Sequence, residues 1–156
     1  MATFNKFNCF VEDVAEKKHN LGSDIFKVLL TNTAPNAGDT YIDTTGGVCI
    51  IQAVSAAQEI AAGNGYTKGG NSAAIASSAQ SGGLYKLVLD DPATWTATPA
   101  AMPTFRYAVL YNETSGTSAA RLPVGWHDYG VGGVTLGIGE TFKADMDPTT
   151  GVLTLQ

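Results

Sequence analysis

The stretch Phe105-Arg106-Tyr107-Ala108-Val109-Leu110-Tyr111 decides the fold class of this chain. Every second residue carries a large aromatic or β-branched side chain, which is the period of a β-strand. The residues between them include Ala108 and Leu110, so the opposite face is also partly apolar. A strand that is apolar on both faces is typical of the covered centre of a sheet. We therefore predict a central strand of a β-sandwich here.

Several other segments have strand character and are separated by clusters of turn residues. Residues 25–31 are apolar and partly β-branched, and they end at the turn cluster 32–39. Residues 141–146 alternate apolar and polar side chains, and a turn at 147–151 leads into Val152-Leu153-Thr154-Leu155, which predicts a C-terminal hairpin. Further strands are predicted over residues 72–78, 84–89, 124–129 and 134–136.

The N-terminal segment over residues 6–18 has the period of a helix instead. Its apolar residues recur at i, i+3, i+4 and i+7, with charged residues opposite, and they are Phe7, Phe10, Val11 and Val14. The charged side chains of the predicted solvent face are Glu12, Asp13, Glu16 and Lys17. Asn and Gly within residues 19–24 then predict the end of one short amphipathic helix.

Two segments have less regular patterns. Residues 40–62 predict a strand followed by a short helix over 54–62, and residues 92–104, with three prolines and no charge, predict a long loop. No alternation of strands and helices indicates a parallel sheet. The chain is therefore predicted to be all-β, an antiparallel, jelly-roll-like β-sandwich with one short N-terminal helix. Residues 1–156 are expected to form a single domain, in which residues 1–6 can serve as an N-terminal arm.

Charged residues make up 15% of the 156 residues, whereas ordinary globular chains carry about 25%. Apolar residues account for 44% and aromatic residues for 9%, a composition that excludes a disordered chain. The net charge of −5, with basic residues spread along the chain, disfavours nucleic acid as a partner. No apolar run approaches the roughly 18 residues of a membrane span, and the start lacks a signal-peptide core, so we expect cytoplasmic synthesis and no membrane contact.

The histidines and cysteines do not form a recognisable catalytic pattern. His127 and Asp128 are adjacent in a predicted strand, so their side chains are expected to point to opposite faces. His19 lies at a predicted helix end, where a partly exposed capping role is favoured. Cys9 and Cys49 have neither redox nor zinc spacing, and we interpret both as small buried residues.

The remaining motifs are better explained as turns. Asp145 and Asp147 form a D-x-D, but the loop lacks the calcium-binding pattern and continues as Pro148-Thr149-Thr150-Gly151, which favours turn formation. The glycine clusters at 130–133 and 137–139 do not complete a phosphate-binding motif. We therefore predict no catalytic residue, no cofactor and no metal site, and we expect that the protein is not an enzyme.

Two apolar segments are candidates for an interface. The uncharged loop carries Trp95 and Met102, and the N-terminal arm and helix carry Phe4, Phe7 and Phe10. Trp, Met and Phe are enriched in interface cores, and large apolar patches are costly to expose on a free monomer. The equally weighted alternative is that these side chains fold back onto the sandwich.

Read as a whole, the chain resembles small structural proteins encoded by tailed bacteriophages. The segments that carry the resemblance are residues 7–24, 26–32, 59–67, 105–112 and 151–155. The resemblance implies a capsid cement or decoration protein that is made in the host cytoplasm, binds the major capsid protein and sits on the capsid surface of the virion as a symmetric homo-oligomer. Two alternatives stay open: a tail or baseplate protein, and a carbohydrate-binding module in which Trp95, Trp126 and the tyrosines stack on sugars.

Overall fold

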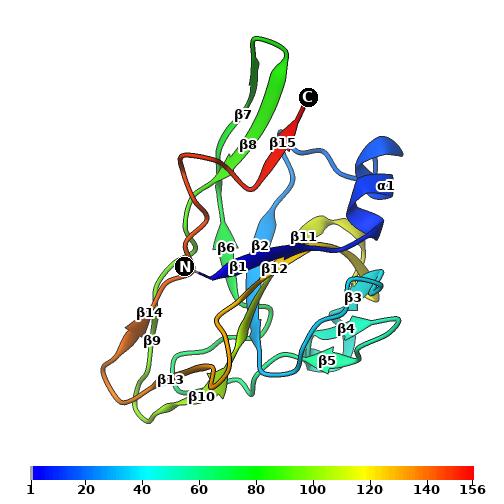
Figure 1. Cartoon of the computed structure of the whole chain (residues 1–156). Helices are drawn as coiled ribbons and strands as arrows, with labels where there is room; N and C mark the ends of the chain where they lie inside the picture. Colours follow the sequence, from blue (N-terminus) through cyan, green and yellow to red (C-terminus); the bar gives the residue numbers. More distant parts are fainter. Residues whose placement is uncertain (1) are drawn as a thin grey trace.

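The computed structural model describes residues 2–156, apart from the side chain of Thr3. It is a mostly β structure of antiparallel sheets with one short helix near the N-terminus, so the predicted fold class is confirmed (Figure 1). Within residues 2–156, no helix has the length and apolar composition needed to cross a membrane.

One large sheet curls into a half-barrel and carries most of the fold. Its strand order is β5-β4-β3-β12-β11-β2-β6, and β1 pairs with the second half of β12. The strands are β1 (Thr3–Lys6), β2 (Phe26–Thr31), β3 (Tyr41–Asp43), β4 (Ile50–Gln52), β5 (Ala57–Gln58), β6 (Asn71–Ala73), β11 (Tyr107–Thr117) and β12 (Ala120–Asp128). Residues 3–6 of the predicted N-terminal arm therefore form a strand of this sheet, and Met1 lies outside the described residues.

Three smaller sheets complete the fold. Their pairs are β9 (Trp95–Thr96) with β14 (Thr141–Phe142), β10 (Met102–Phe105) with β13 (Val134–Leu136), and β8 (Leu84–Leu89) with both β7 (Ile75–Ser81) and β15 (Leu153–Leu155). The strands predicted over 84–89 and 134–136 are confirmed to the residue. The predicted C-terminal hairpin is wrong, because β14 and β15 pair with β9 and β8 and not with each other.

The core confirms that β11 is covered on both faces. Tyr107, Val109 and Tyr111 belong to one buried cluster, and Ala108 and Leu110 belong to the other. The register of β11 is fixed by β12 on one side and by β2 on the other. This strand is therefore the centre of the molecule, as its sequence pattern predicts. Phe105, predicted to share a face with Tyr107, instead lies in β10 and packs in the same cluster as Ala108.

The helix α1 (Cys9–Ala15) is shorter than its apolar period suggests. Phe7 precedes the helix and packs in a different cluster from Phe10, while Val11 is 54% exposed. Asp13, predicted to face solvent, is buried and accepts a hydrogen bond from Lys18 Nζ at 2.9 Å. The helix predicted over 54–62 is also wrong, because this segment holds β5 and turns. The nearest helical element is a short 3-10 turn before it, η1 (Thr45–Gly47).

Candidate functional site

Four of the five predicted interface residues are core residues of this chain. Phe7 packs against Trp126, with ring centroids 4.6 Å apart, and Trp95 stacks on Phe142 at 5.8 Å. The four side chains are at most 3% exposed, and they are those of Phe7, Phe10, Trp95 and Met102. The interface prediction is corrected for these four, because their apolar surface is already covered within the protein.

Phe4 is the exception, since it is 37% exposed and lines a cavity of about 570 Å³. Its ring lies 5.0 Å from that of His127. The walls come from β1, the end of β12 and the C-terminal loop, and they include Phe4, His127, Tyr129, Lys143, Asp145 and Asp147. The structure thus brings His127 and the D-x-D together, although they are far apart in the sequence.

The D-x-D carboxylates of this cavity accept hydrogen bonds from backbone N–H groups of their own turn. Asp145 Oδ1 accepts the N–H of Asp147 at 2.9 Å. Asp147 Oδ1 accepts the N–H groups of Thr149 and Thr150, at 2.9 and 3.0 Å. These bonds confirm the interpretation of the aspartates as turn formers. Across the described part of the chain, no three His, Cys, Asp or Glu side chains gather to hold a metal ion.

His127 and Asp128 point to opposite faces, as predicted. Asp128 accepts two hydrogen bonds from Arg106, at 2.7 and 2.8 Å, and this partner lowers the pKa of the carboxyl group. Burial lowers the pKa of His127, although the charge of Asp145 acts in the other direction. A neutral imidazole is therefore favoured in the cavity.

A second polar cluster surrounds Asn112 on β11. Its Nδ2 lies 2.9 Å from His19 Nδ1, 2.6 Å from Asp24 Oδ2 and 3.0 Å from Ser115 Oγ. His19 is buried, so the predicted partly exposed capping role is wrong. Burial lowers the pKa of His19, and because Nδ1 accepts from Asn112, the neutral tautomer carries its proton on Nε2. The cluster fixes the chain after α1 onto the central strand.

Glu59 is the centre of a third polar cluster and is itself buried. Its Oε1 accepts the N–H of Cys49 at 2.6 Å, and its Oε2 accepts the hydroxyl of Tyr66 at 2.7 Å and the N–H of Gly69 at 2.8 Å. Burial and the neighbouring Glu59 raise the pKa of Cys49 to about 12, so its thiol stays protonated. This arrangement orders backbone and does not activate a nucleophile.

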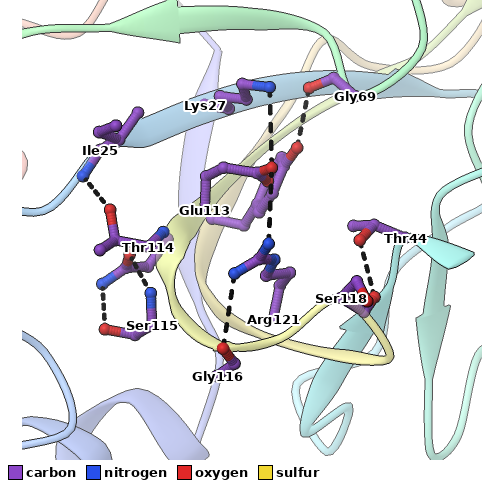
Figure 2. Close-up of polar contacts among 12 residues, drawn as sticks. Ile25, Lys27, Thr44, Gly69, Glu113, Thr114, Ser115, Gly116, Ser118 and Arg121 are labelled. Atoms are coloured by element: carbon purple, nitrogen blue, oxygen red, sulfur yellow. Dashed lines mark hydrogen bonds and ion pairs between the residues drawn. The ribbon is translucent and has the colours of Figure 1, made fainter.

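Figure 2 shows a fourth polar region, where Glu113 of β11 lies between Lys27 of β2 and Arg121 of β12. Glu113 Oε1 is 3.9 Å from Lys27 Nζ and 3.8 Å from Arg121 Nη2. Next to it, the N–H of Ile25 donates to Thr114 Oγ1 at 2.7 Å. Side-chain contacts of this kind join three neighbouring strands at one end of the sheet.

The outer surface of the β7–β8 hairpin differs from all four polar regions. Figure 1 shows this hairpin, in green, projecting beyond the large sheet beside β15. Residues 69–85 contain no charged side chain, and most of β7 is exposed on both of its faces. The exposed residues of β7 are Ala76, Ser77, Ala79, Gln80 and Ser81. This is the most extended uncharged and solvent-facing segment of the described chain.

Comparison with known proteins adds no relative to this description: no family model, no curated protein and no solved structure matches the chain. The features that sequence reasoning missed are the buried carboxylates. Glu59 gives no local signal, because its partners Cys49, Tyr66 and Gly69 are brought together only by the fold. The uncharged run 69–85, in contrast, is readable in the sequence itself.

Proposed function

We propose that this chain is a structural protein of a tailed-bacteriophage particle, where it decorates the capsid by binding the major capsid protein. The observation that carries the proposal is the uncharged run 69–85, which includes the exposed strand β7 and the turn of the β7–β8 hairpin and ends before Lys86 of β8. The surfaces of free proteins are usually rich in charge, whereas the cores of interfaces are depleted of it. The hairpin has the composition of a surface that is covered in an assembly.

The resemblance to phage structural proteins supports the proposal independently of the hairpin. Two of its segments, residues 26–32 and 105–112, hold β2 and the first half of β11. These segments carry the fold and do not form a reactive site. A decoration protein needs no such site, because many copies on a repeating lattice gain avidity from modest contacts in each copy.

The carbohydrate-binding alternative loses both of the tryptophans that motivated it. Trp95 is 1% exposed and Trp126 is 8% exposed, so neither indole offers a face on which a sugar ring can stack. The tail or baseplate alternative shares the surface argument and differs from decoration in copy number and in partner.

The test is co-sedimentation of the purified protein with phage capsids that lack it, followed by counting copies against the major capsid protein. We expect saturable binding at a fixed, high ratio. Binding in only a few copies at the tail would overturn capsid decoration in favour of a tail protein, and no binding would overturn the proposal as a whole.

A pair of matched variants tests whether the hairpin is the binding element. Ser77→Glu combined with Ala79→Glu adds two charges to the exposed hairpin and should reduce capsid binding at least tenfold. Ala61→Glu combined with Ala62→Glu adds the same charge at exposed positions of the body and should leave binding unchanged. Equal effects of the two variants would show that net charge, and not the hairpin, governs binding.

A further inference from the structure

We propose that the free edge of β7 pairs antiparallel with β7 of a second copy of this chain. In the sheet order β15-β8-β7, the strand β7 has a neighbour on one side only. Within residues 2–156, no backbone group outside the hairpin bonds to residues 76–81. The second edge of this seven-residue strand therefore has unpaired hydrogen-bonding groups.

The turn identifies which groups face the free edge. Gly82 and Gly83 form a two-residue turn with φ of +60° and +85°, and Ser81 pairs directly with Leu84. In a hairpin of this type the residues that flank the turn exchange both hydrogen bonds, and the pattern then alternates along the ladder. Gln80 and Ser78 consequently direct their N–H and C=O groups away from β8.

The strand β7 lacks the features that prevent the exposed edge strands of natural proteins from pairing with other chains. Proteins protect exposed edges with Lys, Pro or inward-pointing charges, and Ile75-Ala76-Ser77-Ser78-Ala79-Gln80-Ser81 contains none of these. One register shift lies between Ile75 and Ser77, at the end nearest the body. The distal part of the edge is regular and accessible.

A second copy is the partner that this edge fits best. Two-fold antiparallel pairing places each residue of β7 opposite a residue of the same strand in the partner copy, so a net charge on the strand would be present on both sides of the seam and the two copies would repel each other. An uncharged strand of small side chains avoids this repulsion and lets the two backbones approach. Pairing would join two three-stranded sheets into one of six strands. Self-pairing through β7 does not depend on the proposed function. Only the role of the pair on the phage particle rests on that proposal.

The first test is the oligomeric state of the full chain by analytical ultracentrifugation over a range of concentrations. We expect a monomer–dimer equilibrium for the wild type and for Gln80→Ala, which keeps the outward N–H. Gln80→Pro removes that N–H from both copies and should weaken the dimer by about tenfold to a hundredfold. A wild type that stays monomeric, or a Gln80→Pro variant that dimerises equally well, would overturn the inference.

Amide hydrogen exchange in the wild type provides a second test that does not depend on folding of the proline variant. Protection of the Ser78 and Gln80 amides should rise with protein concentration, whereas the Ala79 amide, which bonds to β8, should change little. Protection that appears only on capsids would contradict self-pairing and assign the edge to a capsid strand. Because this readout needs no particle, failure of self-pairing and failure of capsid binding are distinguishable.

Discussion

The curled sheet and the β7–β8 hairpin both contain few charged side chains, but the uncharged side chains are buried in the sheet and exposed in the hairpin. In the curled sheet, apolar side chains are covered on both faces of β11, and several of the few carboxylates are buried with them. In the hairpin, uncharged side chains face solvent on both sides of β7. Low charge therefore reflects an internal core in one region and an uncovered surface in the other.

Buried carboxylates show how the body uses its charges. Asp39 Oδ1 accepts the N–H groups of Val54 and Ser55, at 2.8 and 2.7 Å, and its Oδ2 accepts that of Asn36 at 2.8 Å. Glu59 holds three donors in the same way. These charges hold irregular backbone in place. Residues 70–85, which include β7, carry no charge and make no contact of this kind, whereas Lys86 in β8 donates to the Thr149 carbonyl. The low charge of β7 is therefore not explained by internal packing.

The largest difference in unfolding free energy between the two regions is expected when one glycine in each is replaced by alanine. A Cβ at Gly70, where φ is +69°, would lie 1.8 Å from the Val28 carbonyl oxygen. Gly70→Ala must therefore separate β2 from β6, and we expect a loss of about 4–5 kcal/mol of unfolding free energy, measured by urea denaturation.

Gly82→Ala in the hairpin turn is the matched control. The backbone is similarly left-handed, with φ of +60°, but a Cβ there meets nothing within 4 Å. Only the intrinsic cost of this conformation applies, which is about 1 kcal/mol. Equal losses at the two glycines would contradict the view that the hairpin is less constrained than the body.

A smaller effect is expected from removing a buried carboxylate. Glu59→Ala leaves the donors on Cys49, Tyr66 and Gly69 without an acceptor, and each unmet buried group costs about 1–3 kcal/mol. We expect a loss of about 3 kcal/mol after partial relaxation. Glu113→Ala is the control, because its cation contacts at 3.8 and 3.9 Å are partly exposed and contribute below about 1 kcal/mol. A similar loss in both variants would show that Glu59 stabilises no more than a surface ion pair.

The sequence predicts strands far better than it predicts their partners. The alternation over residues 107–111 identifies β11 and its two covered faces, because a period of two residues is a local property. It does not extend to Phe105, which lies in β10 and packs in the opposite cluster from Tyr107. The turn after Asp147 is also local, and Gly151 N–H bonds to the Asp147 carbonyl at 2.9 Å. A turn between two strands does not require them to pair, and here β14 and β15 lie in different sheets.

The interface residues were predicted from composition, which does not distinguish an exposed aromatic side chain from a buried one. Trp95 lies in a segment without charge, but its ring is covered by Phe142, whose position depends on the pairing of β14 with β9. Phe7 lies at helical spacing from Phe10, yet α1 begins only at Cys9. Both errors arise because long-range pairing decides which face of a segment is covered.

The smallest expected effect is a dependence on pH that is confined to the body. Burial lowers the pKa of both His19 and His127 from the ordinary value of 6.5. At His19 the charges of Asp13 and Asp24 oppose this shift and that of Lys18 reinforces it. At His127 the charge of Asp145 opposes it. The unfolded chain therefore binds more protons than the folded protein between the two pKa values of each histidine. The unfolding free energy should fall as the pH drops below about 6.5 and level off below the folded pKa.

Urea denaturation between pH 7.5 and pH 5 measures this slope. His19→Asn keeps an acceptor for the Asn112 amide without a titrating ring, so its stability should depend less steeply on pH than that of the wild type. Self-association through β7 should be unchanged over the same range, because that strand carries no ionisable side chain. If the dimer dissociated in parallel with the loss of stability, pairing would depend on the body as well as on the hairpin edge, and the separation between the two regions would fail.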